Sequence, residues 1–202
     1  MTPITDRRVR RTRAALLDAL LALTAEKGYE AVTVQDLIDR ADIGRSTFYA
    51  HFTDKSDLLR EALAGMRAII ESSAAAPVPD RRRPLRFSRR MFHHVRDQQP
   101  LIRALLSHPG ARPVIGEIER MLLDIAQREL EAFASAQAAV KVPVDLLARG
   151  VVASYLATLT WWVANEFRQS PDEMEALFQA MVAPGIRTCI PAHVHDRAAP
   201  TG

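Results

Sequence analysis

Residues 33–52 constrain the fold of this chain more than any other segment, because they predict two short helices joined by a tight turn. Thr33 lies where an N-cap would lie, and the apolar residues after it share one helical face: Val34, Leu37, Ile38 and Ala41. Asp42 tolerates unusual backbone conformations, and Gly44 has no side chain to obstruct the start of the next helix. The pattern predicts a helix-turn-helix.

The second of these helices carries polar groups on one face. Phe48 and Phe52 are four residues apart and are expected to point into a small core, which leaves the opposite face to fit a DNA major groove. Arg45 is suited to paired hydrogen bonds with guanine. The remaining candidates for base edges are small or carry hydroxyls: Ser46, Thr47 and Ala50.

Other residues in or beside this segment are suited to the DNA backbone. Donors at the rim of the second helix fit phosphate oxygens: Tyr49, His51 and Lys55. Thr33 and Gly44, at the two helix starts, complete the predicted DNA contacts in this segment. The alternative is an ordinary helical turn with solvated polar side chains, but the combination of residues favours DNA binding.

Taken together, these residues resemble the N-terminal domain of the TetR family of transcriptional regulators. The resemblance rests on residues 33–34, 43–49, 51–52 and 54–59, and it covers about the first quarter of the chain. It implies an all-α fold, with a three-helix helix-turn-helix domain followed by a helical bundle for ligand binding and dimerisation. It also implies a homodimeric repressor that binds a pseudo-palindromic operator in double-stranded DNA and is released by a small-molecule effector.

The chain departs from this family at two positions. Asp42 stands where the family often has Gly, and Thr24 stands where a larger apolar residue packs from the first helix, so Thr24 is expected to loosen the small core. Two other interpretations remain. One is a regulator of the same fold that activates transcription or responds to a protein, and the other is a helical ligand-binding protein without a DNA function.

Composition and charge distribution agree with a cytoplasmic regulator. The chain has 202 residues, of which 48% are hydrophobic and 25% charged, and no segment is expected to reach the roughly 20 apolar residues that cross a bilayer. No apolar signal-peptide core follows the charged start of the chain, so export and membrane attachment are not expected. The single cysteine, Cys189, excludes an internal disulfide.

Arginines gather in two runs, although the net charge is only +3. The first run precedes an apolar helix that is expected to end at Gly28, and it predicts a basic arm for phosphates or a minor groove: Arg7, Arg8, Arg10, Arg11 and Arg13. Arg11 is the arm residue taken as a DNA-contact candidate, and the alternative is a solubilising tail. The second run, residues 81–90, follows a Pro- and Ala-rich linker and marks a domain boundary; whether it binds anything is left open.

The predicted organisation has four parts: a DNA-binding domain over residues 1–53, a connecting helix and linker over 54–80, a ligand-binding and dimerisation domain over 81–190, and a flexible tail over 191–202. Periodicity and proline positions predict helices at about 54–73, 85–96, 101–107, 113–139, 143–168 and 171–186.

The helix over residues 144–168 has two apolar faces, so it needs two partners. One face is expected to line the domain interior and the other to meet the same helix of a second subunit, together with the last helix. The predicted interface is a four-helix arrangement about a twofold axis formed by Leu156, Leu159, Val163, Phe178, Met181 and Val182.

The interior face predicts an apolar effector pocket with a few polar groups. Its candidate residues are Phe87, Met91, His94, Met121, Tyr155, Thr158, Trp162 and Asn165. The alternative is that these side chains form ordinary core. Trp161 and Trp162 are separated by about 100° around the helix, so only one of them is expected to face the pocket.

No catalytic, cofactor or metal site is predicted. His93 and His94 are adjacent and diverge on a helix, and His193 and His195 lie in the tail. No carboxylate or nucleophile has the spacing that would complete a metal or catalytic site with them.

Overall fold

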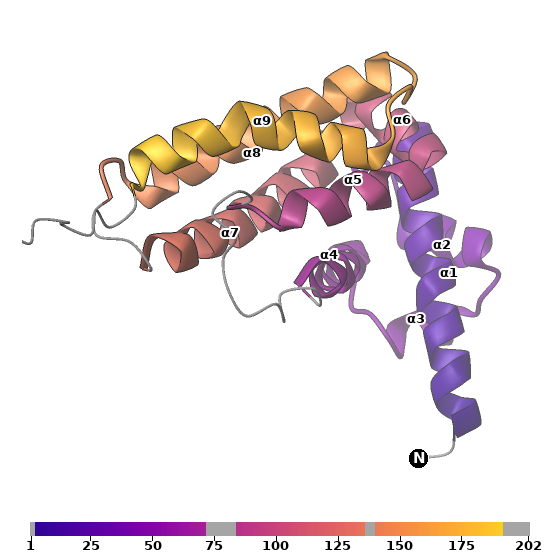
Figure 1. Cartoon of the computed structure of the whole chain (residues 1–202). Helices are drawn as coiled ribbons and strands as arrows, with labels where there is room; N and C mark the ends of the chain where they lie inside the picture. The colour runs from indigo at the N-terminus through magenta and orange to yellow at the C-terminus, as the bar shows by residue number, and fades with distance from the viewer. Residues whose placement is uncertain (1–2, 72–83, 136–139, 192–202) are drawn as a thin grey trace, which may run out of the picture. The chain divides into compact units, whose positions relative to one another are not determined.

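The computed structural model describes residues 3–71, 84–135 and 140–191, and every regular element within them is helical (Figure 1). This confirms the predicted all-α fold. Backbone contacts divide the chain into two units. Unit 1 is Met1–Ser73 with His94–Met121, and unit 2 is Ala74–His93 with Leu122–Gly202.

Unit 1 holds the N-terminal helices and a later segment of the chain. Its helices are α1 (Pro3–Lys27), α2 (Val34–Ala41), α3 (Arg45–Tyr49), α4 (Lys55–Glu71), α6 (Gln99–Ser107), the 3-10 helix η1 (Pro109–Ala111) and the start of α7 (Arg112–Ser135). Unit 2 holds the first half of α5 (Phe87–Asp97), the rest of α7, α8 (Val144–Ala164) and α9 (Pro171–Cys189). The predicted boundary near residue 80 does not anticipate that α6 and η1 pack with α1.

The predicted helix-turn-helix is present in unit 1. Thr33 is the N-cap of α2 and forms a capping box with Asp36, while Asp42 ends that helix in the left-handed conformation, with φ 50° and ψ 54°. Fully buried side chains from four helices form the core beneath it: Leu16, Leu20, Leu37, Phe48 and Leu58. Val114 of α7 also lies in this cluster, so a segment distant in sequence closes the core of the helix-turn-helix.

The N-terminal arginine run is helical instead of an extended arm. Helix α1 begins at Pro3, so every position in the run lies within a helix 25 residues long. A helix with its side chains is about 10–12 Å across, whereas the minor groove of B-DNA is about 6 Å wide. The helix itself is therefore too wide to lie in a minor groove, and contact of its arginine side chains with phosphates or a groove stays a prediction. The side chains of Arg7 and Arg8 lie outside the described residues.

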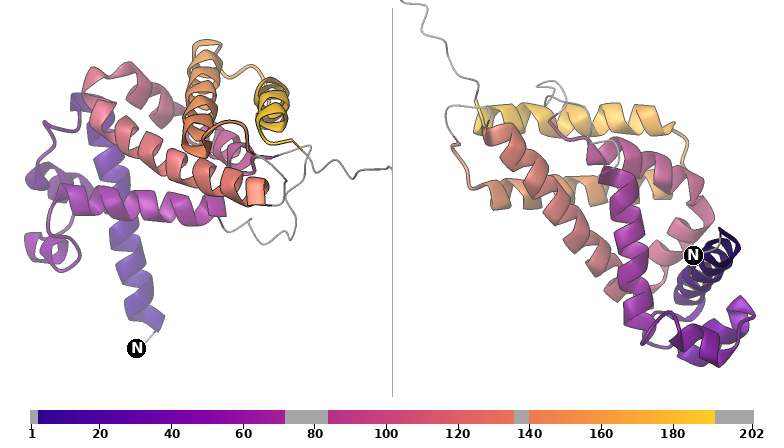
Figure 2. Two further views of the ribbon diagram at one scale, coloured as in Figure 1. Left: turned by 90° about the vertical axis from the view of Figure 1, so that its left-hand side faces the viewer. Right: turned by 90° about the horizontal axis from the view of Figure 1, so that it is seen from below.

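Aromatic side chains from α5, α8 and α9 form the core of unit 2. Tyr155 is central to this core, with ring centroids 4.9 Å from Phe92, 5.7 Å from Phe87 and 5.7 Å from Phe178. Trp162 packs edge-on against Phe92 at 5.8 Å. Figure 2 shows α8 and α9 beside each other along this unit, in agreement with their contacts.

Helix α8 departs from one expectation. Among the helices of the described residues, it is long and apolar enough by length and composition to cross a membrane. Its buried side chains include Val151, Val152, Tyr155 and Trp162, which lie in the core of unit 2. A core helix of a soluble protein meets the same criterion, so this observation gives weak support for a membrane span.

Candidate nucleic-acid interface

Helix α3 presents polar side chains on the face opposite its buried side. Phe48 is fully buried, whereas Arg45 and Ser46 are exposed and Tyr49 keeps 49% of its surface accessible. The Tyr49 ring lies edge-on to Phe48, with centroids 5.3 Å apart, and the Arg45 guanidinium carbon lies 5.7 Å from the Tyr49 centroid. Tyr49 therefore packs against the core, and the Arg45 head group packs against Tyr49 on the exposed face.

Gly44 is the N-cap of α3 and has an ordinary extended backbone, with φ −74° and ψ 150°. A Cβ at this position would lie 3.7 Å from Thr47 Oγ1 and 3.8 Å from Ser46 Oγ, which is normal van der Waals contact. The fold therefore does not require a glycine at position 44, in contrast to the prediction that a side chain there would obstruct the start of α3. The position is exposed beside Arg45, so a close approach by a partner is a separate reason for a glycine there.

Thr33 is engaged in the capping box at the start of α2. Its hydroxyl lies 2.6 Å from Asp36 Oδ2 and accepts a hydrogen bond from the Asp36 backbone N–H at 3.2 Å. Lys27 Nζ lies 2.8 Å from the same carboxylate oxygen. The Lys27 and Thr33 hydrogen bonds hold the pKa of Asp36 well below its usual value. The N-cap role is confirmed, and a DNA contact by Thr33 remains a prediction.

Lys55 has a role that the sequence interpretation missed. Its ammonium group donates to three backbone carbonyls between α1 and α2, at 2.9 Å to Tyr29, 3.1 Å to Glu30 and 3.0 Å to Val32. It also lies 4.6 Å from the Tyr29 ring centroid. An ammonium has three N–H donors, so all of them are used within the chain. Lys55 thus supports the loop before α2, and its predicted phosphate contact stays a prediction.

The remaining predicted DNA contacts lie around this face and in α1. Thr47 and His51 are half-buried, and Arg11 is exposed on α1. Arg13, by contrast, forms an ion pair with Glu61 at 3.2 Å and lies 5.9 Å from the Phe52 centroid, so it joins α1 to the rest of the small core.

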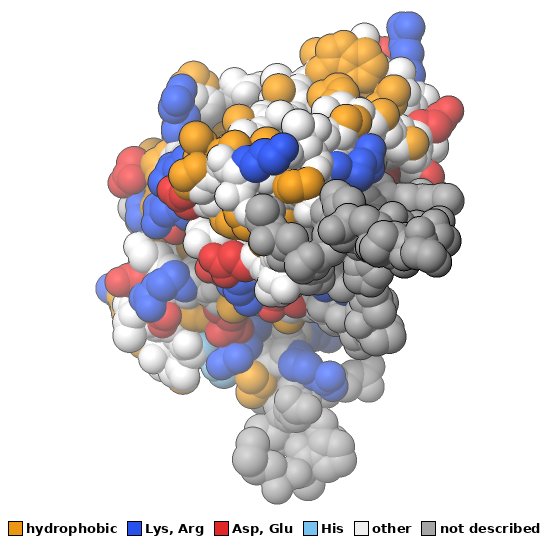
Figure 3. All heavy atoms as spheres, turned by 60° about the vertical axis from the view of Figure 1, so that its left-hand side comes forward, with side chains coloured by type: hydrophobic (Ala, Val, Ile, Leu, Met, Phe, Trp, Pro, Cys, Tyr) orange, Lys and Arg blue, Asp and Glu red, His pale blue; other side chains and the backbone are white. Residues whose placement is uncertain are grey.

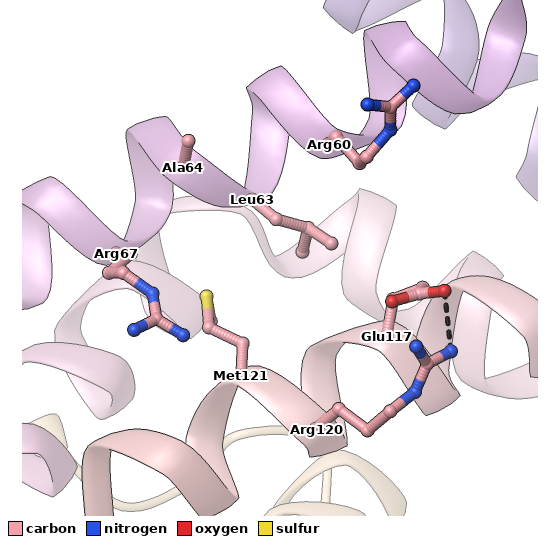
Figure 4. Close-up of a pocket in the computed structure, with 7 residues that line it drawn as sticks. All are labelled: Arg60, Leu63, Ala64, Arg67, Glu117, Arg120 and Met121. Carbon is pink, nitrogen blue, oxygen red and sulfur yellow. Dashed lines mark hydrogen bonds and ion pairs between the residues drawn. The ribbon is translucent and has the colours of Figure 1, made fainter. Parts of the chain in front are cut away.

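Unit 1 also has a surface groove of about 330 Å³ between α4 and α7, which the sequence interpretation did not anticipate (Figure 4). Its lining is Arg60, Leu63, Ala64, Arg67, Glu117, Arg120 and Met121. Arg60 is paired with Asp57, Arg67 with Glu71 and Arg120 with Glu117. The groove could have been anticipated from residues 60, 64 and 67, whose spacing places them on one face of α4. Met121, predicted for the effector pocket, lines this groove instead.

Most of the predicted effector residues meet in the core of unit 2. Phe87, Met91, Tyr155, Thr158 and Trp162 are all buried there. Two of their polar groups are used locally, because Thr158 Oγ1 donates to Ser154 O at 2.8 Å and Trp162 Nε1 donates to Gln169 O at 3.1 Å.

Two other predicted effector residues are not in this core. Asn165 ends α8, where its side-chain amide donates to Trp161 O at 2.8 Å. His94 belongs to unit 1, and burial lowers its pKa. The pattern of apolar residues predicts that the five effector candidates in the core of unit 2 are interior, and their contact with an effector stays a prediction. The pattern did not show where α8 ends or which unit His94 joins.

The predicted dimer residues are divided by burial. Phe178 and Leu159 are buried in unit 2, so they are not available on its surface, and this part of the prediction is wrong. Leu156, Val163 and Val182 are half-buried, and Met181 is 61% exposed. Leu177 of the last helix, which is expected at the same interface, is exposed, and the large exposed side chains of α8 that the prediction missed are Leu146 and Trp161. Figure 3 shows hydrophobic side chains on the surface of the unit that holds α8 and α9.

Within residues 3–71, 84–135 and 140–191, no three His, Cys, Asp or Glu side chains gather in a way that would hold a metal ion. The neighbouring histidines do separate as expected. His93 and Arg89 bind the Asp172 carboxylate, at 3.3 Å and 3.1 Å.

Two family models match the chain. The model for bacterial regulatory proteins of the tetR family matches residues 16–62, and the model for a transcriptional regulator C-terminal region matches residues 83–183. The first match contains the helix-turn-helix, and the second contains the aromatic core and most of α9.

Relatives match the N-terminal region in sequence. The HTH-type transcriptional regulator YxbF of Bacillus subtilis is 46% identical over 56 residues, which are 27% of this chain and 15% of that protein. The HTH-type transcriptional repressor KstR of Rhodococcus jostii is 42% identical over 65 residues, 32% of this chain and 31% of KstR. The matched segment thus spans less than a third of either relative.

Solved structures match over most of the chain. A TetR-family regulator from Syntrophomonas wolfei has a TM-score of 0.68 at 23% identity and covers 88% of this chain and 95% of its own. FadR from Bacillus subtilis, solved with stearoyl-CoA, has a TM-score of 0.64 at 19% identity and covers 85% and 98%. At these identities the likeness shows the fold.

Proposed function

Because the chain belongs to the TetR family of transcriptional regulators, we propose that it is a cytoplasmic repressor that binds a pseudo-palindromic operator as a homodimer and is released by a small apolar effector. The observation that carries this proposal is the exposed face of α3. There Tyr49 packs against the buried Phe48, Arg45 packs against Tyr49, and both side chains are exposed. This is the arrangement with which a recognition helix enters a major groove.

In this proposal, Arg45 contacts a base edge and the residues around it position the helix. A guanidinium bonds bidentately to guanine O6 and N7, which gives base discrimination. Ser46 and Gly44 leave room for close approach, and Tyr49 and His51 reach phosphate oxygens. Arg11 adds a basic group on α1.

The exposed apolar face of α8 and α9 supports dimerisation through a second copy of this chain. On α8, Leu146 and Trp161 are exposed together with Gly150, Ala153 and Ala157, which lie on the same helical face. On α9, Leu177 and Met181 are one turn apart and exposed. A contiguous apolar surface of this kind is typical of a protein interface, and two α8–α9 pairs would form a four-helix contact.

Dimerisation also explains how a short recognition helix selects an operator. Two recognition helices about 34–36 Å apart read successive major grooves, so a twofold protein matches an inverted repeat. A monomer would read one half-site only.

The core of unit 2 supports an apolar effector. Aromatic rings from α5, α8 and α9 form this core, and a neighbour of the same fold, FadR, is solved with stearoyl-CoA. Effector binding would change the operator affinity by tilting α4, which connects directly to the helix-turn-helix. A ligand acts in this way only if it binds the two conformations with different affinities.

The test is selection of binding sites from random duplex DNA with wild-type protein, Arg45→Ala and Arg128→Ala. Arg128 is an exposed arginine on α7, far in sequence from α3, so it controls for the loss of one positive charge. We expect wild type and Arg128→Ala to enrich one inverted repeat, and Arg45→Ala to lose preference at one base pair of each half-site, by about 1–3 kcal/mol. Absence of any enrichment by wild type at low salt would overturn the proposal.

A further inference from the structure

A buried polar cluster lies inside the aromatic core of unit 2. Glu175 and Gln179 are one turn apart on α9 and face inward, with exposed fractions of 3% and 7%. Tyr155 of α8 and Ser88 of α5 are completely buried beside them. Polar side chains are uncommon in a core unless a partner satisfies each polar atom, so the partners of this cluster indicate what it binds.

The contacts of Gln179 fix the orientation of its side-chain amide. Its Nε2 donates to Leu85 O at 2.8 Å and to Glu175 Oε1 at 2.9 Å, and both of these atoms accept hydrogen bonds only. Ser88 Oγ lies 3.2 Å from the same nitrogen. The amide oxygen therefore points the other way, and among the described residues no donor reaches it.

Within the described ranges, Tyr155 has a hydrogen-bond donor without an acceptor, whereas Gln179 has an acceptor without a donor. Its ring packs among Phe87, Phe92 and Phe178, and its buried hydroxyl has no hydrogen-bond partner in the described part of the chain. Burial, and then the charge of nearby Glu175, raise the pKa of Tyr155, so the hydroxyl stays protonated and remains a donor at neutral pH. The cluster thus offers a donor from Tyr155 and an acceptor from Gln179.

We propose that Tyr155 and Gln179 bind a neutral hydroxyl group of the effector, which accepts a hydrogen bond from Tyr155 Oη and donates one to Gln179 Oε1. A hydroxyl group is the smallest neutral group that both accepts and donates. The surrounding phenyl rings suit an apolar body attached to it. An anionic head group is disfavoured, because the Glu175 carboxylate is close enough to affect Tyr155. This inference rests on the proposed effector function.

Helix α9 carries both the polar residues of this cluster and part of the proposed dimer face. Glu175 and Gln179 line the inner side of α9, whereas Leu177 and Met181 are exposed on its outer side. An alcohol held by Gln179 therefore contacts a helix whose other side would meet the second subunit.

The test uses three probes that share an unbranched ten-carbon chain and differ in head group: decan-1-ol, decyl methyl ether, which accepts but does not donate, and decanoate. Thermal unfolding and isothermal titration are measured on full-length wild type, Tyr155→Phe and Tyr29→Phe. Tyr29 is the matched control, because it is a buried tyrosine of unit 1 whose hydroxyl donates to Ser56 Oγ at 3.2 Å. We expect wild type to bind decan-1-ol about tenfold or more tightly than either other probe. Tyr155→Phe should remove this preference, and Tyr29→Phe should keep it.

Without a probe, Tyr155→Phe is expected to unfold at the same temperature as wild type or higher, because it removes a buried hydroxyl that lacks a partner. A lower unfolding temperature would show that the hydroxyl is satisfied within the folded protein, for example by an internal water, and would overturn the inference. Equal binding of the three probes, no binding of decan-1-ol, or an unchanged preference in Tyr155→Phe would also overturn it. The same protein samples are also used for selection of binding sites from random duplex DNA. If they enrich an inverted repeat while the probe results fail, the inference about the alcohol is wrong and the proposed DNA-binding function stands.

Discussion

Gly28 and Gly110 bring two backbone segments of unit 1 into direct contact. A Cβ on Gly110 would lie 2.7 Å from Gly28 Cα, and a Cβ on Gly28 would lie 2.9 Å from Gly110 Cα. Gly28 also has φ +81°, which favours glycine, and the next residue, Tyr29, donates its N–H to Gly110 O at 2.9 Å. The end of α1 is thereby fixed to η1, so a shift of α6 and η1 would carry the helix-turn-helix with it.

Substitution of Gly110 by Ala is expected to separate these backbones. The added methyl group meets backbone atoms that have no alternative rotamer, so we expect the free energy of unfolding to fall by about 1–3 kcal/mol. Operator affinity should fall as well, because the position of the helix-turn-helix changes. Denaturant unfolding and operator titration measure the two effects.

The matched control is Gly116→Ala. Gly116 lies within α7, where a Cβ would meet nothing within 4 Å, so this change should raise the free energy of unfolding by about 0.5–1 kcal/mol. Similar stability changes in the two variants would show that the contact between Gly28 and Gly110 is not tight in solution.

Lys55→Met tests the loop-support role of Lys55. The substitution leaves three carbonyls without their shared donor, and we expect a loss of about 1–3 kcal/mol in the free energy of unfolding. The salt dependence of operator binding should stay unchanged, because no phosphate contact is removed. Arg11→Met is the comparison, and it should reduce the salt slope by about 0.9 with little effect on stability. A reduced slope in Lys55→Met would instead support the phosphate contact that the sequence predicts.

The positions of these glycines and of Lys55 illustrate which features the sequence predicts. The capping box at Thr33, the turn at Asp42 and the buried Phe48 depend on residues close in sequence, and periodicity identifies them. The contact of Gly28 with Gly110 joins residues 82 positions apart, and no local pattern indicates it. Likewise, Lys55 matches a DNA-binding motif, but the carbonyls that it binds lie more than twenty residues away.

Some residues predicted for the dimer interface and the effector pocket lie elsewhere in the structure, for a related reason. An apolar stripe on α9 does not reveal which of its edges faces inward. The sequence therefore predicts Phe178 on the surface, although it packs against Tyr155. Glu175 and Gln179 have the residue types of an exposed face, and only the structure shows that they are buried.

Thr24→Val is expected to stabilise unit 1. Thr24 is completely buried in α1, and its hydroxyl has no hydrogen-bond partner among the described residues. Val has nearly the same shape, so the change removes a buried polar group without a cavity, and we expect a gain of about 1 kcal/mol in the free energy of unfolding. Thr158→Val is the control, because that hydroxyl donates to Ser154 O and its removal should give no gain. Destabilisation of Thr24→Val in denaturant unfolding would mean that the hydroxyl has a partner in solution.

Gly44→Ser distinguishes the needs of the fold from those of DNA binding. The backbone at Gly44 suits any residue, and a serine at an N-cap accepts a hydrogen bond from the helix start, so we expect stability to rise by a few tenths of a kcal/mol at most. If DNA approaches this backbone closely, the added side chain should nevertheless weaken operator binding by about tenfold, equivalent to about 1.4 kcal/mol. Operator titration of Gly44→Ser and of Gly65→Ala, an α4 variant with open space around its Cβ, gives the comparison. Wild-type affinity in Gly44→Ser would place the DNA backbone away from the start of α3, and the docking of the recognition helix would then have to rest on Arg45 and Tyr49.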